Sequence, residues 1–420
     1  MKSDENVFGK AAWRLIPFLM LLYVVSFLDR VNLGFASLTM NADLGFSATI
    51  FGLGSGIFFI GYFLFEVPSN LILEKVGARV WICRIMLTWG VVSMATAFVT
   101  GPVSFYALRF LLGVAEAGFF PGILLYLTYW FPSDMRGRFI ALFLAGVPLA
   151  SAIGSPLSSS IIVGLDGLNG LHGWQWMLLL EGIPSVLLGL TVLKFLPDGP
   201  AKAHWLNDSE RKIITARLDA EPPAAFHGLW DMLADKRIWL LCIPDFGIVL
   251  ALYGLGFWLP QIVKAMGFSI LETGLVVAVP FLVSMVAMVL LGRSSDKHNE
   301  RILHVSVACA VAASGFFVAA LASSIIVQLI ALTFAAAGIY GALAVFWTLP
   351  PSFLRGTAAA GGIALVNCIA NLGGFFGPYL IGWIKDATGG YPIGMAALGF
   401  GLFVSAITVT IVGRKLNRVV

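Results

Sequence analysis

The chain has 420 residues, of which 59% are hydrophobic and only 11% are charged, and its mean hydropathy is +0.93. A soluble domain carries about 25% charged residues, so this composition excludes an ordinary soluble protein and indicates a polytopic membrane protein. The net charge of +4 says little alone, because the placement of the charges matters more, and we expect no nucleic-acid partner. The four cysteines form no CxxC pair, so we expect neither a disulfide framework nor a metal site.

Twelve apolar stretches follow a polar segment of 14 residues, and a membrane-spanning helix needs about 20 such residues. They predict an all-α membrane protein with spans at about 13–38, 49–73, 80–100, 103–131, 138–164, 174–196, 238–262, 270–292, 302–322, 325–348, 357–384 and 391–413. An even number of spans places both ends of the chain on one side. The first stretch is too long for a cleavable signal peptide, so we expect it to remain as the first helix.

The first span carries an aspartate and an arginine side by side, Asp29 and Arg30. Each costs about 2.5–3.5 kcal/mol at the centre of a membrane helix, so such charges persist where they face a partner or a wet cavity. We therefore interpret the pair as part of a functional site. The alternative is a structural ion pair that only locks helices together.

Positively charged residues are distributed very unevenly along the chain. If the N-terminus is cytoplasmic, 22 of the 26 lysines and arginines lie on that side, and only Lys264 and Lys385 lie on the far side. The other two, Arg30 and Arg109, lie inside the membrane. Because Lys and Arg favour cytoplasmic loops, this distribution predicts that both termini are cytoplasmic.

The longest polar stretch, 197–236, divides the chain into two halves of six spans, 1–196 and 237–420. Within this linker, the stretch 209–218 has the pattern of a short amphipathic helix at the membrane surface. A solvated linker is the favoured interpretation.

The two halves also share a motif. Residues 132–137 follow the fourth span and residues 351–356 follow the tenth, and both read Pro-Ser-x-x-Arg-Gly at an offset of 219 residues. The same offset loosely relates the loops 74–79 and 292–297. Duplicated six-span halves related by an axis along the membrane normal are a transporter architecture.

Arg109 and Glu116 lie seven residues apart in the fourth span. Seven steps of 100° bring them within about 20° of each other on a straight helix, so we expect both to face the same cavity as Asp29 and Arg30. A guanidinium binds a carboxylate bidentately, and buried carboxylates are able to carry protons. Two acids and two arginines could therefore couple the binding of an anion to the binding of protons.

The chain resembles the major facilitator superfamily along its whole length, and more narrowly the anion:cation symporter family. The resemblance is carried by 27–36 (FLDRVNLGFA), 56–70 (GIFFIGYFLFEVPSN), 109–122 (RFLLGVAEAGFFPG) and 173–176 (GWQW). It is strongest to the tartrate-transporter branch. It implies twelve helices in two six-helix halves, about a pseudo-two-fold axis along the membrane normal. The implied function is import of an organic anion with protons by alternating access.

The resemblance also implies roles for the charged residues. The arginine that matches Arg30 contacts the anion in the family, and the acids that match Asp29 and Glu116 are linked to protons. We assign Arg109 to pairing with an acid across the cavity.

Further residues complete the expected site. The resemblance places Tyr62, Trp347, Asn367 and, as a weaker candidate, Asn371 around the substrate. An ordinary packing aromatic is the alternative for Tyr62, and a helix–helix hydrogen bond is the alternative for Asn371. A cytoplasmic gate is expected from Glu66, Glu74, Arg79 and Asp296, although the family's loop motif commonly has aspartate where Glu74 stands. Glu181 is expected to be structural.

Other functions fit the sequence less well. An enzyme would need a nucleophile–base set or a metal cluster, whereas the five histidines fall in or near loops and form no HExxH pattern. We therefore expect a transporter without a cofactor, functional as a monomer in the bacterial inner membrane. A hydroxy acid such as tartrate is the favoured substrate. Symport of an aromatic carboxylate and organic-anion exchange remain the alternatives.

Overall fold

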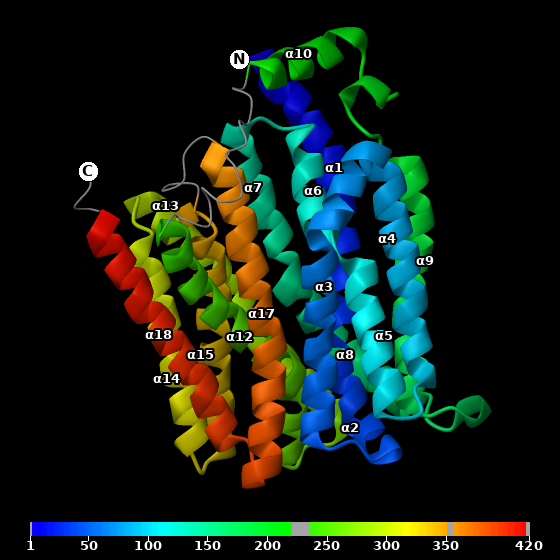
Figure 1. The fold of residues 1–420 in the computed structure, drawn as a ribbon, viewed down its shortest axis with the longest axis vertical. Coiled ribbons are helices and arrows are strands. Elements are labelled where there is room, and N and C mark those ends of the chain that lie inside the picture. The colour runs from blue at the N-terminus through cyan, green and yellow to red at the C-terminus, as the bar shows by residue number, and fades with distance from the viewer. Residues whose placement is uncertain (1, 221–235, 351–356, 417–420) are drawn as a thin grey trace.

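The computed structural model describes residues 2–220, 236–350 and 357–416. Within these residues the regular structure is helical, and twelve spans are long and apolar enough to cross a membrane. The predicted all-α fold with twelve spans is therefore confirmed. Figure 1 shows the helices running roughly parallel, with both ends of the chain at one end of the molecule. That end is called the terminal end below, and the other is called the far end.

The first half contains nine α-helices that make six spans. They are α1 (Lys2–Val31), α2 (Leu33–Leu44), α3 (Ala48–Val76), α4 (Ala78–Ala95), α5 (Pro102–Glu116), α6 (Phe119–Thr128), α7 (Ser133–Leu144), α8 (Gly146–Gly164) and α9 (Gly173–Phe195). The first span is interrupted at Asn32, and the fourth is interrupted after Glu116. Gly118 has a φ of +85°, a conformation that glycine adopts without steric cost. Both interruptions lie next to charged residues of the predicted site.

The second half follows α10 (Asp208–Asp219), and its described residues form six helices. They are α12 (Lys236–Ala265), α13 (Ile270–His298), α14 (Ile302–Leu321), α15 (Ile325–Phe346), α17 (Thr357–Thr388) and α18 (Pro392–Leu416). Short 3₁₀ turns cover Thr96–Phe98, Leu168–Gly170 and Pro200–Lys202. The second copy of the Pro-Ser-x-x-Arg-Gly motif, at 351–356, lies outside the described residues.

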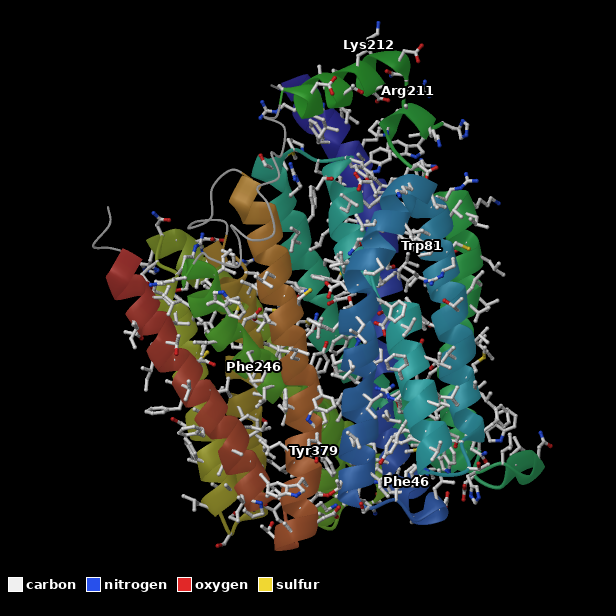
Figure 2. All side chains as sticks on the ribbon, in the orientation of Figure 1. Phe46, Trp81, Arg211, Lys212, Phe246 and Tyr379 are labelled. Carbon is white, nitrogen blue, oxygen red and sulfur yellow. The ribbon has the colours of Figure 1, made fainter. Side chains whose placement is uncertain are left out.

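Part of the linker forms the short helix that was the alternative interpretation: α10 buries Ile214 and exposes most of its other side chains. Asn207 caps α10 by accepting a hydrogen bond from the Glu210 amide. Glu210 in turn accepts from Lys10 of α1 at 2.8 Å, which lowers the pKa of the Glu210 carboxyl. The Trp205 ring stacks on Trp130 with 5.5 Å between centroids. Figure 2 places Arg211 and Lys212 of α10 at the terminal end and Phe46 at the far end.

The two halves meet closely along α3 and α17, which lie side by side (Figure 1). A Cβ atom added to Gly52 would lie 2.5 Å from the Pro378 carbonyl oxygen, and one added to Gly382 would lie 2.2 Å from that of Ala48. Small residues allow helix backbones to approach this closely in a membrane. These contacts involve the half of α3 nearer the far end, so the halves are packed together there.

A carboxylate strengthens this contact between the two halves at the far end. Asp386, in the last turn of α17, accepts hydrogen bonds from the amides of Ala48 at 3.1 Å and Thr49 at 2.7 Å. These amides belong to the first turn of α3, where backbone N–H groups have no partner within the helix. An acid of one half therefore caps a helix of the other half.

Candidate functional site

A pocket with a volume of about 70 Å³ lies between the two halves. Its lining comes from both halves of the chain: Tyr23, Phe27, Arg30, Tyr62, Phe120, Leu144, Val147, Val249, Leu252, Tyr253, Leu343, Trp347, Asn367 and Asn371. Five predicted substrate residues, Arg30, Tyr62, Trp347, Asn367 and Asn371, are therefore brought together. Their roles remain predictions.

Arg30 is the charged residue among those that line this pocket. It lies in the last turn of α1 and is 7% exposed. One guanidinium nitrogen forms an ion pair with Glu116, and the other donates to the Tyr253 hydroxyl at 2.8 Å. The guanidinium carbon also lies 5.1 Å from the centroid of the Phe58 ring and 5.5 Å from that of Tyr62. Arg30 thus joins an acid of its own half to a hydroxyl of the other half.

Glu116 is positioned by the end of α5. It is buried, and its Oε1 accepts a second hydrogen bond from the Ser26 hydroxyl at 2.9 Å. The acid is therefore held by two residues of α1. A buried charge is costly unless it is paired, which explains why Arg30 and Glu116 lie together.

Asp29 points away from the pocket, so the expectation that it shares a cavity with Arg30 is wrong. Consecutive residues of a helix point about 100° apart, and Arg30 occupies the pocket face. The Oδ2 atom of Asp29 accepts from the indole of Trp89 on α4 at 2.8 Å and from the Ser185 hydroxyl on α9. Asp29 thus lies within the first half, between α1, α4 and α9.

Arg109 also departs from its expected place. It donates to the carbonyl oxygens of Gly54 at 3.3 Å and Ser55 at 3.5 Å, and among the described residues it has no ion pair with an acid. The carbonyls are within reach because Gly113 lets α5 approach the backbone of α3. Since Glu116 is occupied by Arg30, the assigned pairing of Arg109 is wrong.

Glu66 lies beside the pocket. Its Oε1 accepts from the Asn367 amide at 2.8 Å, and its Oε2 lies 3.6 Å from the Cys368 sulfur. This contact joins α3 to α17 and holds a pocket-lining residue. The gate role expected for Glu66 stays a prediction, but its place is next to the substrate residues.

The other expected gate residues lie at the terminal end. Glu74 is exposed near the end of α3, and the Arg79 amide donates to Asp198 at 3.0 Å. Asp296 forms an ion pair with Arg301, a residue of its own half. Their gate role stays a prediction.

Sequence reasoning missed Tyr253, the residue of the second half that binds Arg30. It lies in the middle of α12, whereas membrane tyrosines are enriched at the two interfaces. The position of Tyr253 deep in a predicted span could have marked it as a candidate, but an ordinary packing tyrosine can lie at the same depth.

The chain is similar to several known transporters. A protein of Agrobacterium vitis named "Putative tartrate transporter" is 52% identical over 99% of this chain and 93% of its own length. The "Quinolone resistance transporter" of Acinetobacter baumannii is 43% identical over 100% of this chain and 97% of its own length. A crystal structure of a bacterial homologue of the human lysosomal transporter Spinster, inward-facing and occupied, shares the fold. Its TM-score is 0.76 at 17% identity, covering 95% of this chain and 96% of that chain.

A sequence model of the Major Facilitator Superfamily matches residues 19–378. The relatives are named transporters, which confirms the resemblance and the expectation of a transporter rather than an enzyme. With the twelve spans, they indicate a multi-pass inner-membrane protein. The chain therefore belongs to the Major Facilitator Superfamily.

Proposed function

We propose that this protein imports a small organic anion together with protons by alternating access. The observation that carries this proposal is a buried arginine, Arg30, which lies in a pocket between two halves and is paired with the acid Glu116. A guanidinium recognises carboxylates bidentately, and a position between the halves suits alternating access.

The Arg30–Glu116 pair provides a coupling mechanism. A substrate carboxylate and the Glu116 carboxylate compete for the same guanidinium. When a proton binds Glu116, its attraction for Arg30 weakens and the guanidinium becomes available to the substrate. Loss of that proton restores the pair and displaces the anion. Substrate and proton therefore bind together and leave together.

Asp29 serves as a second proton site in this proposal. It is buried and has hydrogen-bond donors in Trp89 and Ser185. Because Asp29 is adjacent to Arg30 in α1, a change in its protonation reaches the pocket through the helix backbone and the local field. It need not touch the substrate.

The polar residues of the pocket favour a hydroxy acid such as tartrate. Tyr62, Asn367 and Asn371 supply hydroxyl and amide groups to a ligand whose carboxylate is on Arg30. The 52% identical relative is named "Putative tartrate transporter".

An aromatic carboxylate is the second candidate. The pocket has an aromatic lining that includes Tyr23, Phe27, Phe120 and Trp347.

In this proposal the terminal end faces the cytoplasm, as the distribution of Lys and Arg predicts. Residues 1–196 and 237–420 move as two bodies joined by 197–236, within a monomer. The far end is packed shut in this structure, which corresponds to a state closed to the outside.

Transport by the purified protein in liposomes tests the function. We expect tartrate to accumulate inside when the outside is more acidic, and accumulation to collapse when a protonophore dissipates the gradient. Exchange of internal for external tartrate without any accumulation would show an anion exchanger instead. A matched assay with benzoate separates the two substrate classes.

A further inference from the structure

Glu66 is a buried acid of α3 that the coupling mechanism above does not use. It is 4% exposed. Its Oε1 accepts from the Asn367 amide at 2.8 Å, and its Oε2 lies 3.6 Å from the Cys368 sulfur. Both partners belong to α17, so Glu66 reaches across the interface between the halves to a residue that lines the pocket. A buried carboxyl in a membrane span is costly, which indicates a function for this contact.

The surroundings of Glu66 suit its carboxylate form. The NH₂ group of Asn367 and the thiol of Cys368 are both hydrogen-bond donors. Asn371, one turn after Asn367, also faces Glu66, and the Arg30 guanidinium is close enough for its positive charge to attract the acid. A carboxylate only accepts hydrogen bonds, so a neighbouring amide must turn its NH₂ group toward it.

The amide of Asn367 is therefore held in one orientation. Its NH₂ group faces Glu66, so its carbonyl oxygen points in a different direction. Asn367 is half-buried and lines the pocket, and among the described residues no donor forms a hydrogen bond with this oxygen. The oxygen is left for a ligand, from which it can only accept a hydrogen bond.

We propose that Glu66 is a positioning residue that sets the substrate class of the pocket. By holding the Asn367 amide, it presents a carbonyl oxygen to a ligand whose carboxylate is on Arg30. A hydroxyl of the ligand donates to this oxygen. A keto group in the same place is a second acceptor, and both oxygens then lack a donor, which is costly in a buried site.

The pocket should therefore favour 2-hydroxy acids over the matching 2-oxo acids. This inference rests on the proposed binding of an organic anion, but it does not depend on proton coupling.

Malate and oxaloacetate test this inference, because they share a four-carbon dicarboxylate skeleton and differ in a hydroxyl against a keto group. The Kd of each freshly dissolved acid is measured on the purified protein at mildly alkaline pH, which favours carboxylate forms. The readout is the ratio of the two Kd values. For the wild type we expect malate to bind about 5- to 150-fold more tightly, the range that an unpaired buried group produces.

Glu66→Gln should abolish this preference. A glutamine amide both donates and accepts, so Asn367 is able to turn either end of its own amide toward the ligand. Loss of the negative charge favours both acids alike, since they carry the same charge, and this effect cancels from the ratio. We therefore expect oxaloacetate to gain more affinity than malate, and the ratio to fall toward one. Damage to the fold would instead weaken both ligands.

Asn367→Ala shows whether Glu66 acts through Asn367. This variant removes the carbonyl oxygen, so its ratio should also fall toward one, but through weaker binding of malate. Adding Glu66→Gln to Asn367→Ala should change the ratio no further, because the amide that Glu66 positions is gone. A further change in the double variant would overturn the positioning role.

Asp245→Asn is the matched control. Asp245 is a buried acid of the second half, and its two carboxylate oxygens have no partner among the described residues. This substitution also removes a buried membrane carboxyl, but Asp245 is not among the residues that line the pocket. The ratio should therefore keep its wild-type value. An equal fall in this variant would show a general effect of removing a buried acid and would overturn the inference.

Two other outcomes would overturn the inference. Equal affinities of the wild type for malate and oxaloacetate would show that the pocket does not present an acceptor. An unchanged ratio in Glu66→Gln, even with a gain for both acids, would show that Glu66 acts through its charge alone.

Failure of the proposed function has a different signature. If the wild type binds neither malate nor tartrate, the proposed substrate class fails and the inference fails with it. If the wild type binds malate but shows no acid-driven uptake, proton coupling fails, whereas the ratio of Kd values still decides the role of Glu66.

Discussion

Arg30 contacts an acid of its own half and a hydroxyl of the opposite half, Glu116 and Tyr253. These two contacts use both terminal nitrogens of the guanidinium, whereas Nε has no hydrogen-bond partner among the described residues. A substrate carboxylate that binds bidentately must therefore replace one of these contacts. At the scale of the single residue, selectivity for anions depends on how readily Arg30 exchanges them.

The first prediction concerns the planar shape of the Arg30 guanidinium. We expect Arg30→Lys to lose most transport while the protein still reaches the membrane, because lysine keeps the charge but not the planar fork that binds a carboxylate bidentately. Uptake per amount of membrane-inserted protein measures this. Near-normal uptake would remove Arg30 from the substrate role.

The second prediction concerns the two acids. Glu116→Gln and Asp29→Asn should abolish uptake driven by a proton gradient, because an amide mimics the protonated acid but releases no proton. At least one variant should retain counterflow. If both still concentrate substrate when the outside is acidic, neither acid is the coupling site.

The third prediction separates the substrate classes. Losing a buried hydrogen-bond partner costs about 1–3 kcal/mol. Asn367→Ala should therefore weaken the binding of tartrate by about 5- to 150-fold and the binding of an aromatic acid much less. Trp347→Ala should weaken the binding of the aromatic acid more than that of tartrate, since aromatic pairs contribute about 0.5–1.5 kcal/mol beyond burial. Binding affinities of both ligands decide this. Equal losses for both ligands would place the specificity pocket elsewhere.

At the scale of elements, α3 and α17 determine whether the far end is shut. The contact between them combines backbones in close approach, at Gly52 and Gly382, with the capping of α3 by Asp386. Opening toward the far end requires that this cap be broken, whereas opening toward the terminal end leaves it intact.

The fourth prediction follows from this cap. Losing a helix cap costs about 0.5–2 kcal/mol, so Asp386→Ala should raise the population open at the far end by roughly 2- to 30-fold. Labelling of an Asn371→Cys variant from the far-end side, with an impermeant thiol reagent, measures that population.

Ser269→Ala provides the control for this experiment. The Ser269 hydroxyl accepts from the Glu272 amide at 3.2 Å within the second half, so its loss removes a helix cap in both states and should leave the labelling rate unchanged. An equal increase in both variants would mean that loss of any helix cap, rather than release of α17 from α3, exposes the pocket.

At the scale of the whole molecule, ligand binding adds to the stability of the folded state. A ligand that binds only the folded protein raises its stability by about 2.7 kcal/mol at 100 times its Kd. Because the Glu116 carboxylate competes with the anion for Arg30, removing its charge should raise the affinity for the anion.

The fifth prediction uses this competition. We expect tartrate to raise the Tm of purified Glu116→Gln more than that of the wild type, because no carboxylate competes for Arg30 in the variant. Equal shifts in the two proteins at the same tartrate concentration would contradict the competition between Glu116 and the substrate.

Some features followed from the sequence alone because they depend on local composition. The length and apolarity of each stretch determine that it spans a bilayer, so the twelve spans agree with the twelve membrane-length helices of the structure. The free-energy cost of placing Asp29 and Arg30 in the first span likewise indicates a functional site, and this inference needs no knowledge of their neighbours.

The tertiary structure decided which of these residues meet. Helical spacing relates residues of one helix, but the partners of Arg30, Asp29 and Arg109 lie on other helices, whose rotation and depth are determined by packing. Close approach of the helices at glycines brings the α3 carbonyls within reach of Arg109. The 100° step between Asp29 and Arg30 directs the Asp29 carboxylate toward α4 and α9. Composition determined the spans and their charges, whereas helix packing decided which charge faces the pocket.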